Sequence, residues 1–307
     1  MEYSILVLKQ AVIMIFICVI GMICYKTDII TKNVQKYFSS LVLKVVMPCV
    51  IVTSFQIDLS PEIMNGLIMA VLLSIISHII MILFSNLLIR KKEEREYAIE
   101  RFSLVYTNCG YMGIPLIEGV LGAEGVLYAT VYMIVFNIFV WSHGVVVMRD
   151  KFSLRDLLAV LKSPTMISIG IGLVLLVSGL KLPFIIAKPL NYVALMNTPL
   201  PMLVAGVTIA QQSFFDTVKD FRAILISVMR MIILPIIVFF VIRWIPCSDI
   251  VFLSIILSVS CPTAAIGTLF AIEYNKNAAY ASRIFAITTV ASSITMPLII
   301  LFVNLFN

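Results

Sequence analysis

The chain has 307 residues, of which 62% are hydrophobic and 12% are charged, and its mean hydropathy is +1.11. Soluble domains are about 45–50% apolar and about 25% charged, so the composition excludes a soluble globule; disorder, which needs low hydrophobicity and high charge, is excluded as well. The net charge of +6 does not indicate nucleic-acid binding, because the basic residues lie in short connections between apolar runs. We therefore predict an all-α, multi-pass membrane protein.

Ten apolar runs are long enough to cross a bilayer, which takes about 20 helical residues. In chain order they are spans 1 to 10, at residues 5–25, 37–55, 63–88, 98–121, 126–148, 164–180, 187–210, 221–245, 250–272 and 278–303. The connections between them are short, so we expect no inserted soluble domain.

Lysine and arginine are distributed unequally between the two sides. The connections after odd-numbered spans carry sixteen of them, namely Lys26, Lys32, Lys36, Arg90, Lys91, Lys92, Arg95, Arg101, Arg149, Lys151, Arg155, Lys162, Lys219, Arg222, Lys276 and Arg283. The opposite side carries four, namely Lys9, Lys181, Lys188 and Arg243. Since cytoplasmic loops are enriched in basic residues, we predict that both termini lie outside the cytoplasm of a cell (cytoplasmic) membrane.

The ten spans divide into two halves of five. The first repeat covers residues 1–148, a cytoplasmic loop covers 149–163, and the second repeat covers 164–307. An odd number of spans in each half places the two halves in inverted orientation. Corresponding breaks in two inverted halves are typical of a transporter's central site.

Prolines mark corresponding spans of the two halves. Pro48 lies in span 2, and Pro199 and Pro201 lie in span 7; Pro115 lies in span 4 and Pro262 in span 9. A proline inside a membrane helix is tolerated only where other groups satisfy the freed backbone. Prolines are also common in membrane helices generally, so the pairing is an indication of symmetry and not a proof.

The segment from Asn108 to Pro115 predicts a break inside span 4. It holds Gly110 and Gly113 together with the proline and an amide, which is a poor helix former in lipid. An unwound centre leaves the N-terminus of the following half-helix with free N–H groups, which favour an anion. The Asn108 amide can donate to a carboxylate. The alternative interpretation is a purely structural kink.

Span 9 holds a companion break around Cys261, Pro262 and Thr263. Small residues around the proline permit close helix crossing. If inverted symmetry relates the halves, this break meets the break in span 4 near the centre of the bilayer.

These segments resemble the auxin efflux carrier family, which includes bacterial malate-permease-like members and the plant PIN-formed auxin transporters. The resemblance is carried by Asn108 to Glu118, Gly122 to Gly125, Pro262 to Ala264, Glu273 to Asn275, Ser282, Ile284, Thr295 and Pro297, and more weakly by Pro48, Thr198 to Leu200, Gly206, Arg230, Leu234 and Pro235. It extends over nearly the whole chain.

The resemblance implies ten helices as two inverted five-helix repeats, with broken helices 4 and 9 crossing at their centres. It implies an elevator-type carrier of organic anions, with a scaffold of spans 1, 2, 6 and 7, and a homodimer formed through that scaffold. Asn108 would lie near the substrate carboxylate. Many members have a second asparagine where this chain has Tyr111, so the substrate does not carry over.

Charged and polar residues inside the spans are the remaining candidates. No acid lies deep in a span, which argues against a cation as main substrate. Arg230 and Lys44 are candidate charge residues, with snorkelling to the surface as the alternative. His143 is a candidate proton relay or an ordinary interior histidine. Thr53 and Ser54 follow Pro48 and either face the breaks or lie at the outer helix end.

The sequence therefore predicts a secondary carrier that exports a small organic anion, such as malate or an auxin-like acid, without a cofactor or a metal. Its substrate-binding set is Asn108, Gly110, Tyr111, Gly113, Pro115, Cys261, Pro262, Thr263, Thr53 and Ser54. Alternatives are a proton- or sodium-coupled uptake carrier, a channel, and a transporter-like anion sensor. An intramembrane enzyme is disfavoured, because the chain offers two histidines and no deep acid.

Overall fold

The computed structural model describes residues 2–90, 96–149, 162–211 and 219–306. Helices form nearly all of these ranges. They are α1 (Glu2–Lys26), α2 (Lys32–Leu41), α3 (Met47–Ser54), α4 (Pro61–Leu88), α5 (Tyr97–Val105), α6 (Ile114–Phe139), α7 (Val145–Arg149), α9 (Pro164–Ser178), α10 (Phe184–Ala194), α11 (Pro199–Ala210), α13 (Phe221–Val228), α14 (Leu234–Ile242), α15 (Asp249–Ser260), α16 (Ile266–Glu273) and α17 (Ala278–Phe306). The predicted loop 149–163 lies mostly outside the described residues.

Wide π-helical turns interrupt several of the long helices. Four of them are η1 (Val42–Val46), η2 (Cys109–Gly113), η3 (Val140–Gly144) and η5 (Met229–Ile233), and η4 (Leu195–Asn197) is a short 3₁₀ turn. A proline stands two residues after three of these turns, at Pro48, Pro115 and Pro235, and prolines and π turns are both common causes of a bend in a helix. Such π turns are frequent at functional sites.

Seven helices of the described ranges are long and apolar enough to cross a membrane, and α9 and α15 are shorter apolar helices. The membrane class predicted from composition is therefore confirmed. Many large apolar side chains are exposed on this surface, as lipid requires; Phe16 and Leu83 are more than 60% exposed. The predicted set of ten spans stays a prediction.

Gly122 divides α6 into two parts. Its backbone has φ 65° and ψ −159°, a conformation that essentially only glycine adopts. The chain bends sharply there, and a Cβ atom at Gly125 would lie 2.4 Å from Leu121 Cβ and 3.0 Å from Ile117 Cγ2. The long helical stretch from Cys109 to Arg149 thus consists of two segments that meet at a kink.

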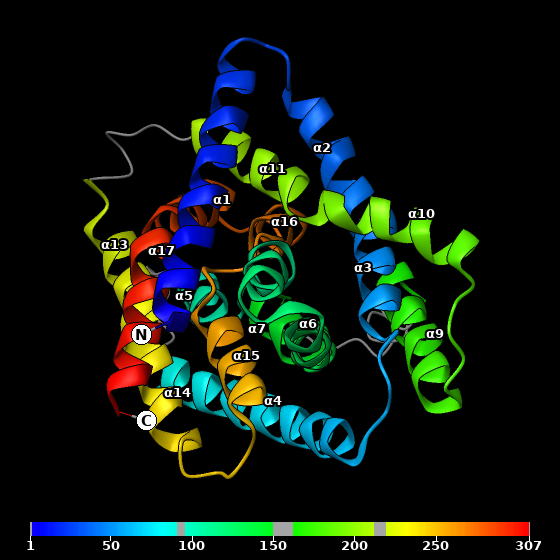
Figure 1. Ribbon diagram of the computed structural model, residues 1–307. Coiled ribbons are helices and arrows are strands. Elements are labelled where there is room, and N and C mark those ends of the chain that lie inside the picture. The colour runs from blue at the N-terminus through cyan, green and yellow to red at the C-terminus, as the bar shows by residue number, and fades with distance from the viewer. Residues whose placement is uncertain (1, 91–95, 150–161, 212–218, 307) are drawn as a thin grey trace.

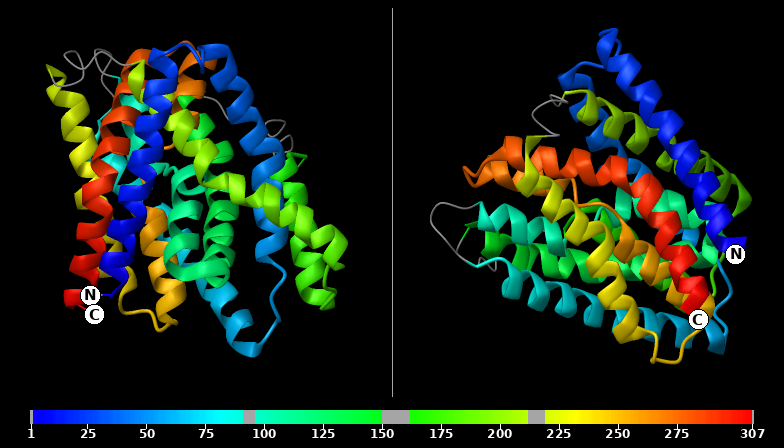
Figure 2. Two further views of the ribbon diagram at one scale, coloured as in Figure 1. Left: turned by 45° about the horizontal axis from the view of Figure 1, so that its top comes forward. Right: turned by 90° about the vertical axis from the view of Figure 1, so that its left-hand side faces the viewer.

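Two groups of helices lie on opposite sides of a central set. Figure 1 shows α2, α3, α9 and α10 on one side of the molecule and α13, α14 and α17 on the other, with α5, α6 and α15 between them. In both views of Figure 2 the two chain ends lie close together. The Asn304 side chain donates to Ser4 Oγ at 2.9 Å, so α17 ends beside the start of α1.

Close packing joins α1 to α11. A Cβ atom at Gly206 would lie 2.0 Å from the Cys18 carbonyl oxygen, and one at Gly21 would lie 2.4 Å from that of Leu203. Only glycine allows this approach, as at the small-residue contacts of membrane helices.

The loops after α3 and α9 are also joined. Gln56 Oε1 accepts the N–H of Leu182 at 2.7 Å, and Lys181 Nζ lies 2.8 Å from Asp58 Oδ1. The hydrogen bond and the positive charge of Lys181 hold the pKa of the Asp58 carboxyl below its ordinary value. The pair is well exposed, so it contributes little to stability.

Candidate functional site

The non-helical segments after α5 and α15 lie against each other. The N–H of Asn108 donates to the Pro262 carbonyl at 2.8 Å, and the N–H of Ala264 donates to the Tyr106 carbonyl at 2.8 Å. Thr107 and Thr263 form an antiparallel bridge between these two bonds. Each break thereby satisfies backbone groups that the other leaves free, which a protein interior without water requires. We call residues 106–113 the first break and residues 261–265 the second break.

The local sequence explains the first break. The carbonyl of Asn108 accepts both the Met112 N–H at 3.1 Å and the Gly113 N–H at 3.2 Å, so the chain resumes as a π turn. Pro115 then stands in the first turn of α6, where its missing N–H costs nothing. The following half-helix therefore begins inside the protein.

The Asn108 side chain remains uncommitted. The residue is 7% exposed, and none of the hydrogen bonds in the described part of the chain uses its side-chain amide. A nearly buried amide without a protein partner is costly unless water or a ligand pairs with it. Asn108 is therefore the strongest ligand-binding candidate at the breaks.

The two glycines of the first break permit close contacts. A Cβ atom at Gly113 would lie 3.0 Å from Cys261 Sγ of the second break. A Cβ atom at Gly110 would lie 3.0 Å from Met47 Cε and 3.6 Å from Met133 Sδ. Gly113 thus faces the second break, whereas Gly110 faces α3.

Tyr111 contacts α2, and Pro115 contacts α1. The Tyr111 hydroxyl donates to the Ser39 carbonyl of α2 at 3.3 Å. Gln10 Nε2 of α1 donates to the Pro115 carbonyl at 3.3 Å. Both hydrogen bonds are long, so each contributes only modestly to the stability of these contacts.

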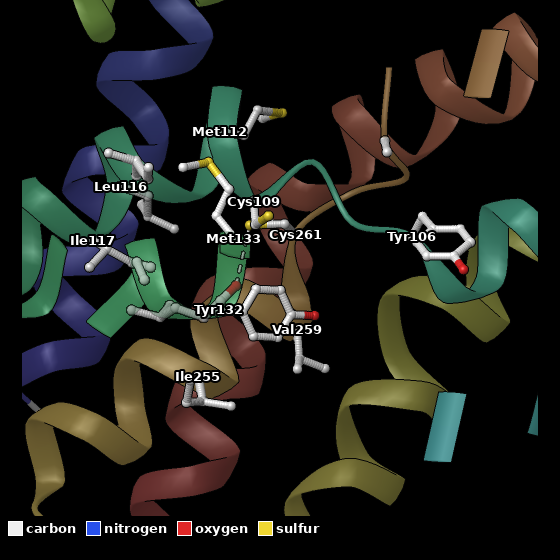
Figure 3. Close-up of a cluster of buried hydrophobic side chains, with 14 of the residues drawn as sticks. Tyr106, Cys109, Met112, Leu116, Ile117, Tyr132, Met133, Ile255, Val259 and Cys261 are labelled. Carbon is white, nitrogen blue, oxygen red and sulfur yellow. Dashed lines mark hydrogen bonds between the residues drawn. The ribbon is translucent and has the colours of Figure 1, made fainter. Parts of the chain in front are cut away.

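The second break is supported by neighbouring helices. The Thr263 N–H donates to Thr288 Oγ1 of α17 at 3.3 Å. Cys261 is fully buried, and its thiol donates to the Leu257 carbonyl at 3.3 Å. Figure 3 shows Cys261 beside Cys109, with Tyr132 and Val259 next to them.

Thr53 and Ser54 are placed differently from the other predicted residues. Their hydroxyls donate to carbonyls of their own helix, those of Cys49 and Val50 for Thr53 and that of Ile51 for Ser54. The residue of α3 that meets the first break is Met47, which lies about 9 Å before Thr53 at 1.5 Å per residue. Among the described residues neither hydroxyl forms a hydrogen bond with the breaks, so their place in the site stays a prediction.

The two basic candidates, Lys44 and Arg230, differ in burial. Lys44 is exposed, as the snorkelling alternative expects. Arg230 is fully buried, and its Nη2 donates to the carbonyls of Val259 at 2.6 Å and Cys261 at 2.8 Å. Its Nη1 lies 3.8 Å from Met81 Sδ. Arg230 therefore belongs to the surroundings of the second break.

His143 also lies beside the site. Its Nδ1 is 2.9 Å from the Tyr106 hydroxyl, which in turn donates to the Phe139 carbonyl at 2.9 Å. Tyr106 is the first residue of the first break. The His143 imidazole therefore contacts a residue that takes part in the backbone pairing. No group of three potential metal-ligating side chains gathers within the described ranges.

Four buried polar atoms around the breaks have no hydrogen-bond partner. They are Thr107 Oγ1, Tyr132 OH, Ser260 Oγ and Arg230 Nε. The sequence analysis missed Thr107, Tyr132 and Thr288, since isolated hydroxyls in apolar runs are common. The proximity of Thr107 to the Asn108 motif is the only local signal that points to any of them.

The buried acid of this region is neutralised. Glu100 of α5 is 2% exposed, and Arg222 of α13 pairs with both of its carboxylate oxygens at 2.7 Å. The Tyr280 hydroxyl of α17 donates to it at 3.2 Å, and Arg283 pairs with Asp220 nearby. This network joins α5, α13 and α17 into one body. No local pattern predicts this network, because Glu100 is more than 100 residues away from both Arg222 and Tyr280.

Comparison with known proteins gives a consistent result. A family model described as "Membrane transport protein" matches the chain twice, over residues 6–159 and 151–300. An uncharacterized transporter of Methanocaldococcus jannaschii is 24% identical over 298 residues, which cover 90% of this chain and 92% of that relative.

Proposed function

The chain belongs to the membrane transport protein family, and from this premise we propose that it carries small organic anions, carboxylates such as malate or auxin-like acids, across the cytoplasmic membrane. The family assignment and the apolar helices establish a multi-pass transporter. A transporter family also argues against an enzyme. The anion, the direction and the mechanism are our proposals.

The uncommitted Asn108 amide is the observation that carries the anion proposal. It lies where two broken helices pair through their backbones, and the half-helix that follows starts with its N–H groups near the break. Helix N-termini and amide donors both favour a carboxylate. The buried acid of the neighbourhood, Glu100, is already paired with Arg222, so it leaves no free negative charge to attract a cation.

We propose that the ten predicted spans form two inverted five-helix repeats, residues 1–148 and 164–307. The kink at Gly122 supports the division of α6 between spans 4 and 5. The hydrogen bond between Ser4 and Asn304 supports an even number of crossings, because it joins the start of the first predicted span to the end of the last. The sixteen-to-four charge asymmetry supports termini outside the cytoplasm.

We further propose an elevator-type movement against a scaffold built around α1 to α3 and α9 to α11, with a homodimer formed through that scaffold. The contacts between the first break and these helices suit sliding. They include two long hydrogen bonds, to Ser39 and from Gln10, and a methionine contact at Gly110. An anion that leaves the cell moves down the membrane potential, which releases about 2.3 kcal/mol of free energy per charge per 100 mV. Export therefore needs no coupled ion.

The test is flux in liposomes under an imposed membrane potential, with malate, other dicarboxylates and indole-3-acetate as probes. We expect saturable, potential-driven flux of at least one probe. Asn108→Ala should raise the half-saturating concentration tenfold or more, because a hydrogen bond to a charged group contributes about 1.5–3 kcal/mol.

Asn137→Ala is the matched control. The Asn137 amide donates to the Met133 carbonyl of its own helix at 2.8 Å, so its loss should leave flux near the wild-type value. Flux of none of the probes by folded protein would contradict the substrate class. Equal flux of the wild type and Asn108→Ala would contradict the site.

A further inference from the structure

Arg230 is the charged group that the proposed mechanism has not yet used. It is fully buried in the π turn between α13 and α14, and it lies against the end of α15. We propose that Arg230 is a positioning residue that stands where a bound metal cation would otherwise hold the second break, so that anion binding needs no sodium or potassium ion. This inference rests on the proposed anion function and deepens it.

The hydrogen bonds of Arg230 go to oxygen atoms that suit a cation. α15 ends at Ser260, and Arg230 Nη2 donates to the carbonyls of Val259 and Cys261 at that end. The last carbonyls of a helix have no partner within it and carry the negative end of the helix dipole. Carbonyl oxygens are also the ligands that hard metal cations prefer. The guanidinium therefore occupies a cation position.

The positive charge of Arg230 is not cancelled by an acid. Among the described residues no carboxylate pairs with it, and the ionisable side chains with which it interacts electrostatically include the Tyr132 phenol and the thiols of Cys109 and Cys261. An arginine stays protonated even when buried. Removing this charge from water costs several kcal/mol of free energy. Because no acid cancels the charge, the site has a positive electrostatic potential, which an anion at the breaks would compensate.

Buried hydroxyls lie close to this charge, since Ser260 stands between the two residues whose carbonyls Arg230 binds and the Tyr132 phenol interacts with it electrostatically. Arg230 Nε, Tyr132 OH, Thr107 Oγ1 and Ser260 Oγ are buried without hydrogen-bond partners. Thr107 is the residue before Asn108 and belongs to the bridge with Thr263. The charge thus acts on the anion through the paired backbone and through these donors, and Asn108 provides the direct contact.

The first experiment measures binding. The thermal unfolding temperature of the purified chain is followed while malate or indole-3-acetate is titrated, in sodium, potassium and N-methyl-D-glucamine salts. We expect the same half-saturating concentration, within twofold, in the three salts. Arg230→Met should raise it tenfold or more, Arg230→Lys should restore most of the loss, and Lys44→Met, which removes an exposed charge, should have no effect.

A second readout separates positioning from folding. In the liposome assay, Arg230→Lys should keep the maximal flux and raise KM, whereas a merely structural residue would lower the amount of active carrier without changing KM. A sodium requirement of the wild type, or an unchanged half-saturating concentration in folded Arg230→Met, would overturn the proposal.

A third readout needs no substrate, so it judges Arg230 even if no probe binds and the proposed function fails. Removal of the guanidinium in Arg230→Ala exposes the carbonyls of Val259 and Cys261. Sodium should then raise the unfolding temperature of Arg230→Ala above its value in N-methyl-D-glucamine, and it should not do so for the wild type. Equal sodium stabilisation of both proteins, or of neither, would contradict the substitution of an arginine for a metal ion. If Arg230→Ala does not fold, the same comparison is made with Arg230→Met, whose uncharged side chain also leaves the two carbonyls without a cation.

Discussion

The first and second breaks pair with each other but are held in different ways. The first is organised by its own residues, since the Asn108 carbonyl accepts two N–H groups of the following turn and the side chain stays free. The second is held from outside, by Arg230 at the Cys261 carbonyl and by Thr288 at the Thr263 N–H. In the function that we propose, the first break recognises the ligand and the second supplies charge and support.

The largest expected effect comes from forcing the two breaks apart. Gly113→Val adds a branched side chain whose Cβ would lie 3.0 Å from Cys261 Sγ. Overpacking of this kind costs about 1–3 kcal/mol, and flux should fall to background because the paired backbone shifts. Flux in liposomes and the unfolding temperature measure both results. Gly170→Val is the control, because nothing lies within 4 Å of a Cβ at Gly170. Normal flux in Gly113→Val would show that the contact is dispensable.

The next effect separates recognition from support. Asn108→Asp places a negative charge where we propose that the carboxylate binds, and the repulsion is on the order of 2–4 kcal/mol at an effective dielectric constant of about 20. The half-saturating concentration of the probe should therefore rise about 30-fold or more, beyond that of Asn108→Ala. Titration of the unfolding temperature measures it. If the aspartate and alanine variants bind equally, no anion lies beside Asn108.

A smaller effect is expected at the support of the second break. Thr288→Val removes the oxygen that accepts the Thr263 N–H and leaves that donor buried without a partner. The free energy of unfolding should fall by about 1–2 kcal/mol, and the half-saturating concentration should change less than twofold. In the control Thr130→Val, the lost hydroxyl donates to Val126 of its own helix. A large loss of affinity in Thr288→Val would place recognition in the second break as well.

The smallest effect is expected at Tyr111. Its hydroxyl donates to the Ser39 carbonyl at 3.3 Å, a long bond that contributes about 0.5–1 kcal/mol. Tyr111→Phe should therefore change the maximal flux by about two- to fivefold and leave KM unaltered, because the ring stays in place. A tenfold change in KM would instead make the phenol part of the ligand site.

Much of the fold could be predicted from the sequence. The apolar runs coincide with helices of the structure, and the glycines and prolines of residues 108–115 and 260–265 marked both breaks. The sequence left open whether Arg230 snorkels or is buried. That depends on the carbonyls of Val259 and Cys261, about 30 residues away, and no local pattern encodes such a contact. Thr53 and Ser54 were predicted from their distance to Pro48, yet their hydroxyls bond within their own helix.

The sequence alone determined the membrane class, the positions of the breaks and the family, because these follow from composition, from the backbone limits of glycine and proline and from ordered motifs. Only the tertiary structure decided which polar groups are paired and which remain free. Glu100 is neutralised by Arg222, the Asn108 amide is uncommitted, and Arg230 holds the end of α15. Inside a membrane a buried polar group is defined by its partner, and these partners are distant in the chain.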